Sequence, residues 1–341
     1  MRDLRRFFTL KRGSEYACLP ALLGLTVFAA VLGMCLGTVS VSPGDMFHII
    51  LGGLTGTAEA RIILYARLPR TCGSLLAGAA LAVSGTVIQN VLANPLAAPN
   101  VIGVNSGAGF MTAVCCAAMP AALEAVPLAA FLGALSGVML VLFIAERAGA
   151  SKLTLILAGL AVSSMFGAGI DAVVTFAPEA LNGYTDFRIG GLSNISMNRI
   201  APAAGLIATA LAVVFSLAHE LDLLALGNET AQSLGLPTRK VRLLLLTMAA
   251  ALSGAAVSFA GLLGFVGLIV PHIMRRLVGE ESRALLLSSA LGGASLLTFS
   301  DILARLLFAP YDLPVGLVLS FVGGPFFIWL LLRQRGGRIH D

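Results

Sequence analysis

The sequence predicts an all-α protein that crosses a membrane several times, and three observations support this fold class. First, 58% of the 341 residues are hydrophobic and only 11% are charged, against about 25% charged residues in an ordinary soluble domain. Second, the mean hydropathy is +0.95, which indicates a chain surrounded by lipid or by other apolar helices. Third, the apolar residues form runs of about 20, the length of a helix that crosses a bilayer core. These properties exclude a soluble enzyme.

Ten apolar segments can be identified, which is about the number that a chain of this length can accommodate with short connections. The first follows a basic amino-terminal tail, residues 1–18, and is too long to be a cleaved signal sequence. We therefore predict a single transmembrane domain over 1–341 with ten spans. The segments lie near 18–39, 68–92, 105–121, 125–145, 153–176, 200–218, 241–260, 262–275, 284–307 and 314–332.

The lysines and arginines predict which loops face the cytoplasm. If the amino terminus is cytoplasmic, sixteen of the 22 basic residues fall on cytoplasmic segments and six on the outer side, as the positive-inside rule expects. The basic tail, a long loop at 220–240 and the tail at 333–341 are then cytoplasmic, and so are both termini. The net charge of +5 is an orientation signal and does not indicate nucleic-acid binding, because the basic residues are dispersed among loops.

A faint internal repeat relates the two halves of the chain. Arg70 precedes the Ser-Gly pair at Ser84 by the same interval that separates Arg239 from the Ser-Gly pair at Ser253. In the predicted topology the two copies run in opposite directions, and inverted repeats of this kind build many transporters. Matched positions in glycine-rich helices also arise by chance, so both interpretations stay open.

The sequence lacks the motifs of several enzyme classes. No GxxxxGK[ST] motif occurs, so we do not expect the chain itself to hydrolyse ATP. His219 and Glu220 begin like a zinc-protease motif, but no second histidine follows at helical spacing. An intramembrane serine nucleophile at Ser106 has no histidine base within the spans. We therefore predict no catalytic residue, metal site or cofactor, and interpret GVNSGAG and residues 133–137 as small-residue faces for helix packing.

Two acidic residues fall inside predicted spans, where a carboxylate is costly. Asp301 is followed at i+4 by Arg305, so we favour a structural ion pair at the outer end of that helix. Asp171 has no partner within a helical turn. It either lines an aqueous cavity or lies close enough to the outer surface to be solvated, and as a carrier group it would make the chain an ion-coupled secondary transporter.

Two further regions are candidates for contacts with other molecules. Arg67 and Arg70 stand at the outer entrance to the second span, where arginines either anchor to lipid headgroups or hold carboxylates of a partner protein. The long loop contains ALGNETAQSLGLPTRK, which predicts a short helix over 229–234, with Gly235 at its carboxyl end and Pro237 just beyond.

Five ordered blocks of the sequence resemble the signature blocks of the membrane permeases of ATP-binding-cassette importers for iron-siderophores, haem and cobalamin, the type II importers. The likeness runs from 67 to 332. It is specific, because several blocks match in order. The blocks are RLPRTCGSLLAGAALAVSGTVIQNVLANPLAAPNVIGVNSGAG, LALGNETAQSLGLPTRK, SGAAVSFAGLLGFVGLIVPHIMRRLVG, SDILARLLFAP and LPVGLVLSFVGGPFFIWLL.

The resemblance implies a type II importer permease fold with ten helices per subunit, a homodimer around a central pathway, and a location in the cytoplasmic (inner) membrane. It also implies two cytoplasmic ATP-binding subunits and a substrate-binding protein, either periplasmic or tethered to the surface. An iron-siderophore is the expected substrate because it is the commonest class in this family. Haem and cobalamin are the alternatives.

The resemblance also implies roles for particular residues. The three outer arginines, Arg67, Arg70 and Arg305, would pair with acidic residues of the binding protein. The cytoplasmic gate would lie near Lys152 and Leu153, with the pathway along the fifth span and Asp171, followed by a short outer helix near 187–197. The helix that couples to the ATPase would comprise Gly227, Glu229, Ala231, Leu234 and Gly235, although this chain has Asn228 and Gln232 where the family usually has glutamate and often arginine.

Overall fold

The computed structural model describes residues 16–37, 41–52, 57–149, 152–193, 195–307, 309 and 311–335. Most of the two predicted tails lies outside these residues. Within them the chain forms helices and no strand, which confirms the all-α class. The helices are α2 (Leu19–Cys35), α3 (Pro43–Ile50), α4 (Ala58–Arg61), η1 (Ile62–Arg67), α5 (Leu68–Leu92), η2 (Pro99–Ile102), α6 (Val104–Ala118), η3 (Leu123–Ala125), α7 (Val126–Arg147), α8 (Lys152–Phe176), α9 (Ala180–Ile189), α10 (Met197–Ser216), α11 (Ala218–Ala225), α12 (Asn228–Ser233), α13 (Thr238–Ala260), α14 (Val266–Val278), α15 (Ser282–Leu306) and α16 (Val315–Arg335).

Each of the ten predicted apolar segments coincides with a helix: α2, α5, α6, α7, α8, α10, α13, α14, α15 and α16. Within the described ranges, six helical stretches are long and apolar enough to cross a membrane by length and composition. Three more, α2, α6 and most of α16, are apolar but shorter. The fold is therefore that of a multi-helix membrane protein.

Two helices depart from the sequence prediction. The second predicted span begins earlier than 68, because α4, η1 and α5 form one continuous stretch of 35 residues. Pro69 has no N–H with which to bond the carbonyl of residue 65, and the wider turns of the π-helix η1 lie just before it. The outer helix predicted near 187–197 was wrong in position: α9 ends at Ile189, and Gly190 follows with a positive φ of 72°.

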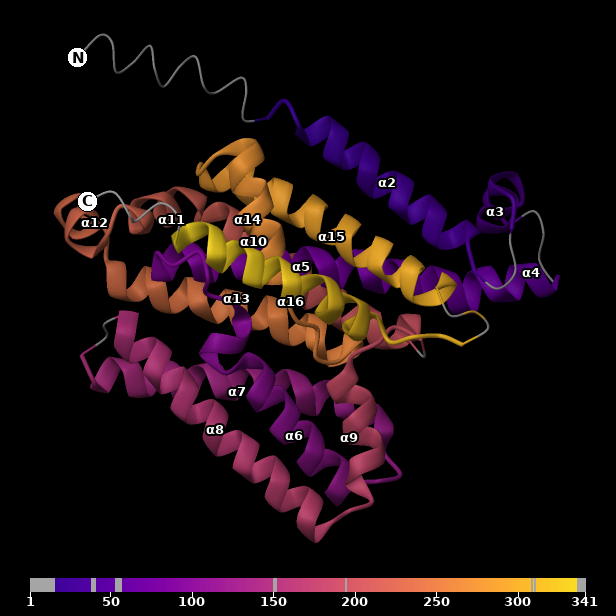
Figure 1. Cartoon of the computed structure of the whole chain (residues 1–341), viewed down its shortest axis with the longest axis horizontal. Coiled ribbons are helices and arrows are strands. Elements are labelled where there is room, and N and C mark those ends of the chain that lie inside the picture. The colour runs from indigo at the N-terminus through magenta and orange to yellow at the C-terminus, as the bar shows by residue number, and fades with distance from the viewer. Residues whose placement is uncertain are drawn as a thin grey trace.

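The helix α5 lies at the centre of the molecule and packs along α15 (Figure 1). Gly78 and Gly293 lie at the closest approach, where an added Cβ on either glycine would overlap the backbone of the other helix. Buried hydroxyls bridge the same interface, Ser74 to Thr298 at 2.8 Å and Thr86 to Ser289 at 3.0 Å. Close backbones and hydroxyl pairs are how helices associate where lipid removes the usual hydrophobic driving force.

The helices α6 and α7 pack through the small-residue faces that the sequence predicts. Gly107 lies against Gly133, and Gly103 lies against Gly137. The hydroxyl of Ser106 is 3.2 Å from the carbonyl of Gly103 and also lies 3.1 Å from the hydroxyl of Ser163. Ser106 thus takes part in packing contacts within the bundle.

Helices from the first half of the chain pack against helices from the second half at the centre of the bundle. In the first half α5 packs on α15 of the second, and α13 of the second half packs on α7 of the first. The helices α5 and α13 themselves lie against one another. At this crossing Ser84 and Ser253, the two residues matched by the sequence repeat, both donate a hydrogen bond of 2.7 Å to the carbonyl of Ala249.

The candidate regions lie at opposite ends of the bundle. Figure 1 shows α3, α4 and the carboxyl end of α15 at one end, and α12 with the start of α13 at the other. The helix α8 runs along the edge of the bundle, and only 22% of its apolar window is buried inside the chain. The first end will be called the arginine end and the second the α12 end.

Candidate functional site

The three outer arginines of the sequence prediction come together at the arginine end. Arg67 is the last residue of η1, Arg70 lies in the first turn of α5, and Arg305 lies in the last turn of α15. Their exposed fractions are only 4%, 6% and 7%. A buried guanidinium requires hydrogen-bond partners and compensating negative charge, and the structure supplies both.

Two of these arginines bind the carboxyl end of α2. Arg67 Nη1 donates to the carbonyls of Met34 and Cys35 at 2.9 and 2.8 Å. Arg305 donates to the carbonyls of Leu36 and Gly33 at 3.0 and 3.1 Å. The last carbonyls of a helix lack partners within it and carry partial negative charge. The two side chains therefore fix the end of α2 against α5 and α15.

The acidic partners of the cluster come from α15 and the loop after it. Arg70 Nε lies 2.9 and 3.1 Å from the two carboxylate oxygens of Asp301, whose side chain is 2% exposed. Arg305 Nε lies 3.2 Å from the same carboxylate, which confirms the predicted i,i+4 pair. Arg70 Nη1 also bonds Asp312 at 2.7 Å, and the Asp312 side chain is 42% exposed.

The sequence located this cluster at one end of the bundle but did not show how it is bonded. We expected guanidinium groups that point outward, whereas each of the three is buried and bonded within the chain. The remaining nitrogen of Arg70, Nη2, is buried without a hydrogen-bond partner among the described residues. Sequence reasoning missed Asp312 and the link from Arg70 to Asp301, since these residues lie more than 200 positions from Arg70.

At the α12 end, the loop folds as the sequence predicts. The predicted helix over 229–234 is α12, Asn228–Ser233. Gly235 follows with φ +84°, and the amide of Leu236 bonds the carbonyl of Ala231 at 3.0 Å. This is the left-handed glycine ending expected from local chemistry.

The side chains around α12 have contrasting exposure. Ala231 is fully buried, while Glu229 is exposed and Leu234 is 60% exposed. Leu226, one residue before Gly227, is 61% exposed. The element is therefore attached on one side and presents apolar side chains on the other, which is typical of a surface that a partner covers.

The predicted gate and pathway residues lie along α8. Leu153 is 66% exposed at the first turn, and it shares an exposed stripe with Leu157, Leu160 and Asp171. The side chain of Lys152 lies outside the described residues. Burial raises the pKa of the Tyr184 phenol, Arg188 opposes this shift and Asp171 adds to it. Asp171 therefore lies near Tyr184, in the middle of α9.

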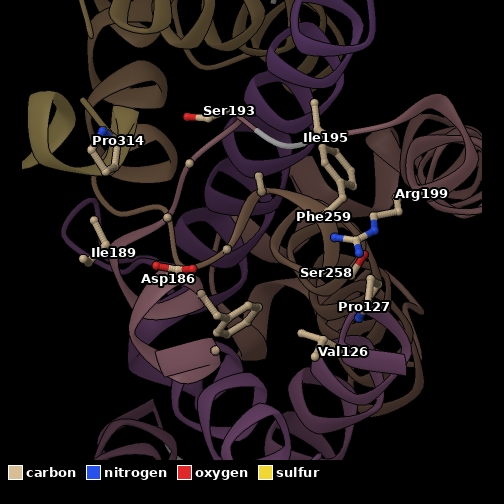
Figure 2. Close-up of a pocket in the computed structure, with 16 residues that line it drawn as sticks. Val126, Pro127, Asp186, Ile189, Ser193, Ile195, Arg199, Ser258, Phe259 and Pro314 are labelled. Carbon is tan, nitrogen blue, oxygen red and sulfur yellow. The ribbon is translucent and has the colours of Figure 1, made fainter. Parts of the chain in front are cut away.

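Two cavities open at the ends of the bundle. One of about 450 Å³ lies between α7, α9, α10 and α13, and Figure 2 shows Arg199 pointing toward Ser258 with Asp186 on the opposite wall. The other, of about 230 Å³, lies at the α12 end beside the exposed ion pair of Arg239 and Glu146. Of the described residues that the sequence prediction assigns to docking, coupling or the gate, none lines either cavity, although part of the predicted outer helix, 187–197, lines the larger one.

Comparison with known proteins finds one transport family and several permeases that are similar to this chain over most of its length. A model of the FecCD transport family matches residues 25–333. The chain is 38% identical over 325 residues to the hemin transport system permease protein HmuU of Yersinia pestis, covering 93% of this chain and 96% of the relative. It is 36% identical over 328 residues to the Fe(3+) dicitrate transport system permease protein FecC of Escherichia coli, covering 93% and 98%.

A solved structure shows a similar fold. It is an inward-facing conformation of a metal-chelate type ABC transporter, with a TM-score of 0.83, 27% identity, and coverage of 92% of this chain and 98% of that one. The similarity therefore extends over nearly the whole chain.

Proposed function

Because the chain belongs to the FecCD transport family, we propose that it imports an iron-siderophore-type chelate across the cytoplasmic membrane. The chain is the permease subunit of an ABC transporter, and ATP hydrolysis is the task of a separate subunit. The family match over 25–333 carries this conclusion. The similarity to a hemin permease keeps haem as the alternative substrate, and cobalamin is a further alternative within the same resemblance.

The proposed topology has ten crossings in an inverted repeat, with both termini in the cytoplasm. Three observations support it. A helix lies at each predicted segment, and helices of the two halves pack against one another. The two serines of the sequence repeat, Ser84 and Ser253, both donate to the carbonyl of Ala249. In this topology the α12 end is cytoplasmic and the arginine end is the outer end. The whole chain, 1–341, is then one transmembrane domain surrounded by lipid.

We propose that two copies of the chain form a homodimer around the pathway, with α8 facing it. The exposed stripe from Leu153 to Asp171 supports this assignment, because an apolar helix face of that length requires either lipid or another protein surface. Lys152 and Leu153 would then form the inner gate. The Asp171 carboxylate would face the aqueous pathway near its outer end, where water can solvate it.

The proposed contact with the two ATP-binding subunits is α12 with its flanking glycines. Transport is a change of access, so the movement of those subunits must enter the permease as a rigid-body displacement. The residues we assign are Gly227, Glu229, Ala231, Leu234 and Gly235. Exposed Glu229 and Leu234 would contact the ATPase, buried Ala231 would anchor the helix, and the glycines would set its two ends.

The proposed docking face for a periplasmic or surface-tethered binding protein is the outer face around Arg67, Arg70 and Arg305. Since their guanidinium groups are bonded internally, an acidic residue of the binding protein would dock by replacing half-exposed Asp312 as a partner of Arg70. Asp312→Asn should then raise the affinity for the binding protein several-fold, on the order of one exposed ion pair. Unchanged or weaker binding in a titration would contradict this.

The proposed substrate is tested by reconstituting the permease with its ATPase subunits and binding protein in proteoliposomes. Ferric siderophores, ferric citrate, haem and cobalamin are compared for uptake and for stimulation of ATP hydrolysis. We expect a ferric chelate to give the largest response. Preferential uptake of haem or cobalamin would contradict the substrate assignment, and uptake that stops with a protonophore but survives an inactive ATPase would indicate an ion-coupled transporter.

A further inference from the structure

A chain of polar contacts at the α12 end runs from half-buried Asp222 into the buried interior and joins the proposed coupling loop to the core of the bundle. It begins at Asp222 on α11, the helix that precedes α12. Asp222 Oδ1 accepts a hydrogen bond of 2.8 Å from the amide of Ser282, the first residue of α15. The first amides of a helix have no partner within it and carry partial positive charge. Asp222 therefore adds a cap from another element to that of Glu281, the N-cap residue of α15, which accepts from the amide of Ala284 at 2.9 Å.

The contacts continue from Ser282 to the last turn of α5. The Asn90 side-chain amide lies 3.4 Å from the hydroxyl of Ser282. Arg275 of α14 then donates to both side-chain carbonyls of the last turn, to Asn90 Oδ1 and to Gln89 Oε1, at 2.6 Å each. Gln89 Nε2 donates to the carbonyl of Gly267 at the start of α14 at 3.2 Å. Four helices, α11, α15, α5 and α14, are thus connected.

Asp222 and Arg275 are half-buried, whereas the groups that they bind are buried, which holds the contacts in place. Ser282 is fully buried, Gln89 is 1% exposed and Asn90 is 8% exposed. A buried polar group that loses its partner is not rehydrated and bears the full desolvation cost. Movement of α11 relative to α15 would break the chain at Asp222, so the four helix ends favour moving together.

The helix α11 lies between α12 and the core of the bundle, so it can transmit movement from one to the other. Its buried side, Ala218, Leu221 and Leu224, packs on the bundle, where α11 contacts α5, α13 and α15. Its carboxyl end leads through Leu226 and Gly227 directly into α12. A displacement applied to α12 therefore reaches α11 first, and α11 passes it to the core through packing and through Asp222.

We propose that Asp222 is a positioning residue for coupling, which transmits displacement of α12 to α15, α5 and α14. This inference rests on the proposed function, in which α12 receives the movement of the ATPase. Asp222 touches neither substrate nor nucleotide. Its role is to keep α11 and the start of α15 in register while the loop is pushed or pulled.

The test compares Asp222→Ala, which removes the acceptor, with Asp222→Asn, which retains an oxygen for the Ser282 amide. The full transporter is reconstituted with its ATPase and binding protein, and uptake of radiolabelled ferric citrate, or of haem where the wild type transports haem, is measured together with ATP hydrolysis. We expect the number of ATP molecules hydrolysed per chelate transported to rise about tenfold in Asp222→Ala. A factor of about ten corresponds to the loss of one hydrogen bond to a charged acceptor. Asp222→Asn should stay close to the wild type.

The control is Glu179→Ala, which removes a carboxylate at the other end of the bundle that caps no helix. If Asp222→Ala does not assemble, Arg275→Lys tests the same chain, because it retains the charge but loses the double contact with Gln89 and Asn90. An unchanged ratio in a working transporter, or an equal rise in Asp222→Asn, overturns the role of Asp222. A wild type that takes up no chelate instead refutes the proposed function.

Discussion

The arginine end and the α12 end both carry charged residues that sequence analysis selected for partner contacts, yet they are built in opposite ways. At the arginine end three guanidinium groups are 4–7% exposed and bonded within the chain. At the α12 end Glu229, in the six-residue helix α12, and Leu234, directly after it, are both exposed. The charged groups of the arginine end are bonded mainly within the chain, with Arg70 Nη2 the exception among the described residues, whereas the α12 end leaves exposed side chains for a partner.

This difference indicates a division of labour between the two ends. The arginine end holds the ends of α2, α5 and α15 together through ion pairs and helix-end carbonyls. The α12 end changes little in stability when its exposed side chains change, because they have few partners to lose. We therefore expect substitutions at the arginine end to lower stability first, and substitutions near α12 to lower coupling first.

The largest expected effect is that of Asp301→Asn. This change removes the carboxylate shared by Arg70 and Arg305. Among the described residues, buried Arg305 is left with neutral partners only, and Arg70 keeps half-exposed Asp312 as its one remaining carboxylate. Removing one partner of a buried ion pair costs about 3–5 kcal/mol. Thermal unfolding of the purified permease in detergent should show it, while Asp171→Asn, at an exposed position, serves as the control. Equal effects of the two would contradict the comparison.

The next effect is that of Arg67→Met, which retains an apolar side chain but removes the donor to the carbonyl of Met34. The carbonyl of Cys35 would keep only the amide of Val41, at 3.1 Å. An unsatisfied buried acceptor costs about 1–3 kcal/mol. Arg61→Met is the matched control, because Arg61 lies one turn and a half earlier on the same helical stretch and is exposed. A loss of stability in the control that matches Arg67→Met would show that the cap contributes nothing.

A smaller effect is expected for Gly235→Ala at the end of α12. Gly235 has φ +84°, and a residue with a Cβ adopts that conformation at a cost of about 1 kcal/mol. The reoriented helix end should reduce the stimulation of ATP hydrolysis by the binding protein. Gly324→Ala, a helical glycine with open space around it, should leave stimulation unchanged. Normal stimulation in Gly235→Ala would argue against a role for the turn.

The smallest effect on stability is that of Leu234→Ser, within about 0.5 kcal/mol because the side chain is on the surface. Its affinity for the ATP-binding subunits should nevertheless fall several-fold, since an apolar contact is lost from the interface. The measurement is a pull-down titration of the ATPase in detergent, with Leu206→Ser, on the exposed surface of α10, as the control. Retained affinity would remove Leu234 from the interface.

The sequence predicted local features well. The ten apolar segments all coincide with helices, because length and hydropathy are properties of each segment alone. The helix before Gly235 was predicted within one residue, since a left-handed glycine followed by proline ends a helix through short-range bonds. The Asp301 and Arg305 pair was found for the same reason, as it lies at i,i+4.

Features that depend on distant residues could not be predicted in this way. The burial of Arg70 depends on Asp301 and Asp312, which become neighbours only after folding. The binding of Arg67 to the end of α2 depends on how α2 packs beside η1. The error in the position of the outer helix has a local cause. Gly190 and Gly191 follow the end of α9 at Ile189, so the helix covers only the first three residues of the predicted range, 187–197.

The central claim is that the arginine end and the α12 end lie on opposite sides of the membrane. It is tested most directly by labelling with a membrane-impermeant maleimide in a cysteine-free background carrying either Asp312→Cys or Leu234→Cys. In cells whose cytoplasmic membrane is intact and whose outer envelope admits the reagent, the account predicts that only the Asp312→Cys variant reacts. In inside-out membrane vesicles, only the Leu234→Cys variant should react. Reaction of both positions from the same side would contradict the account.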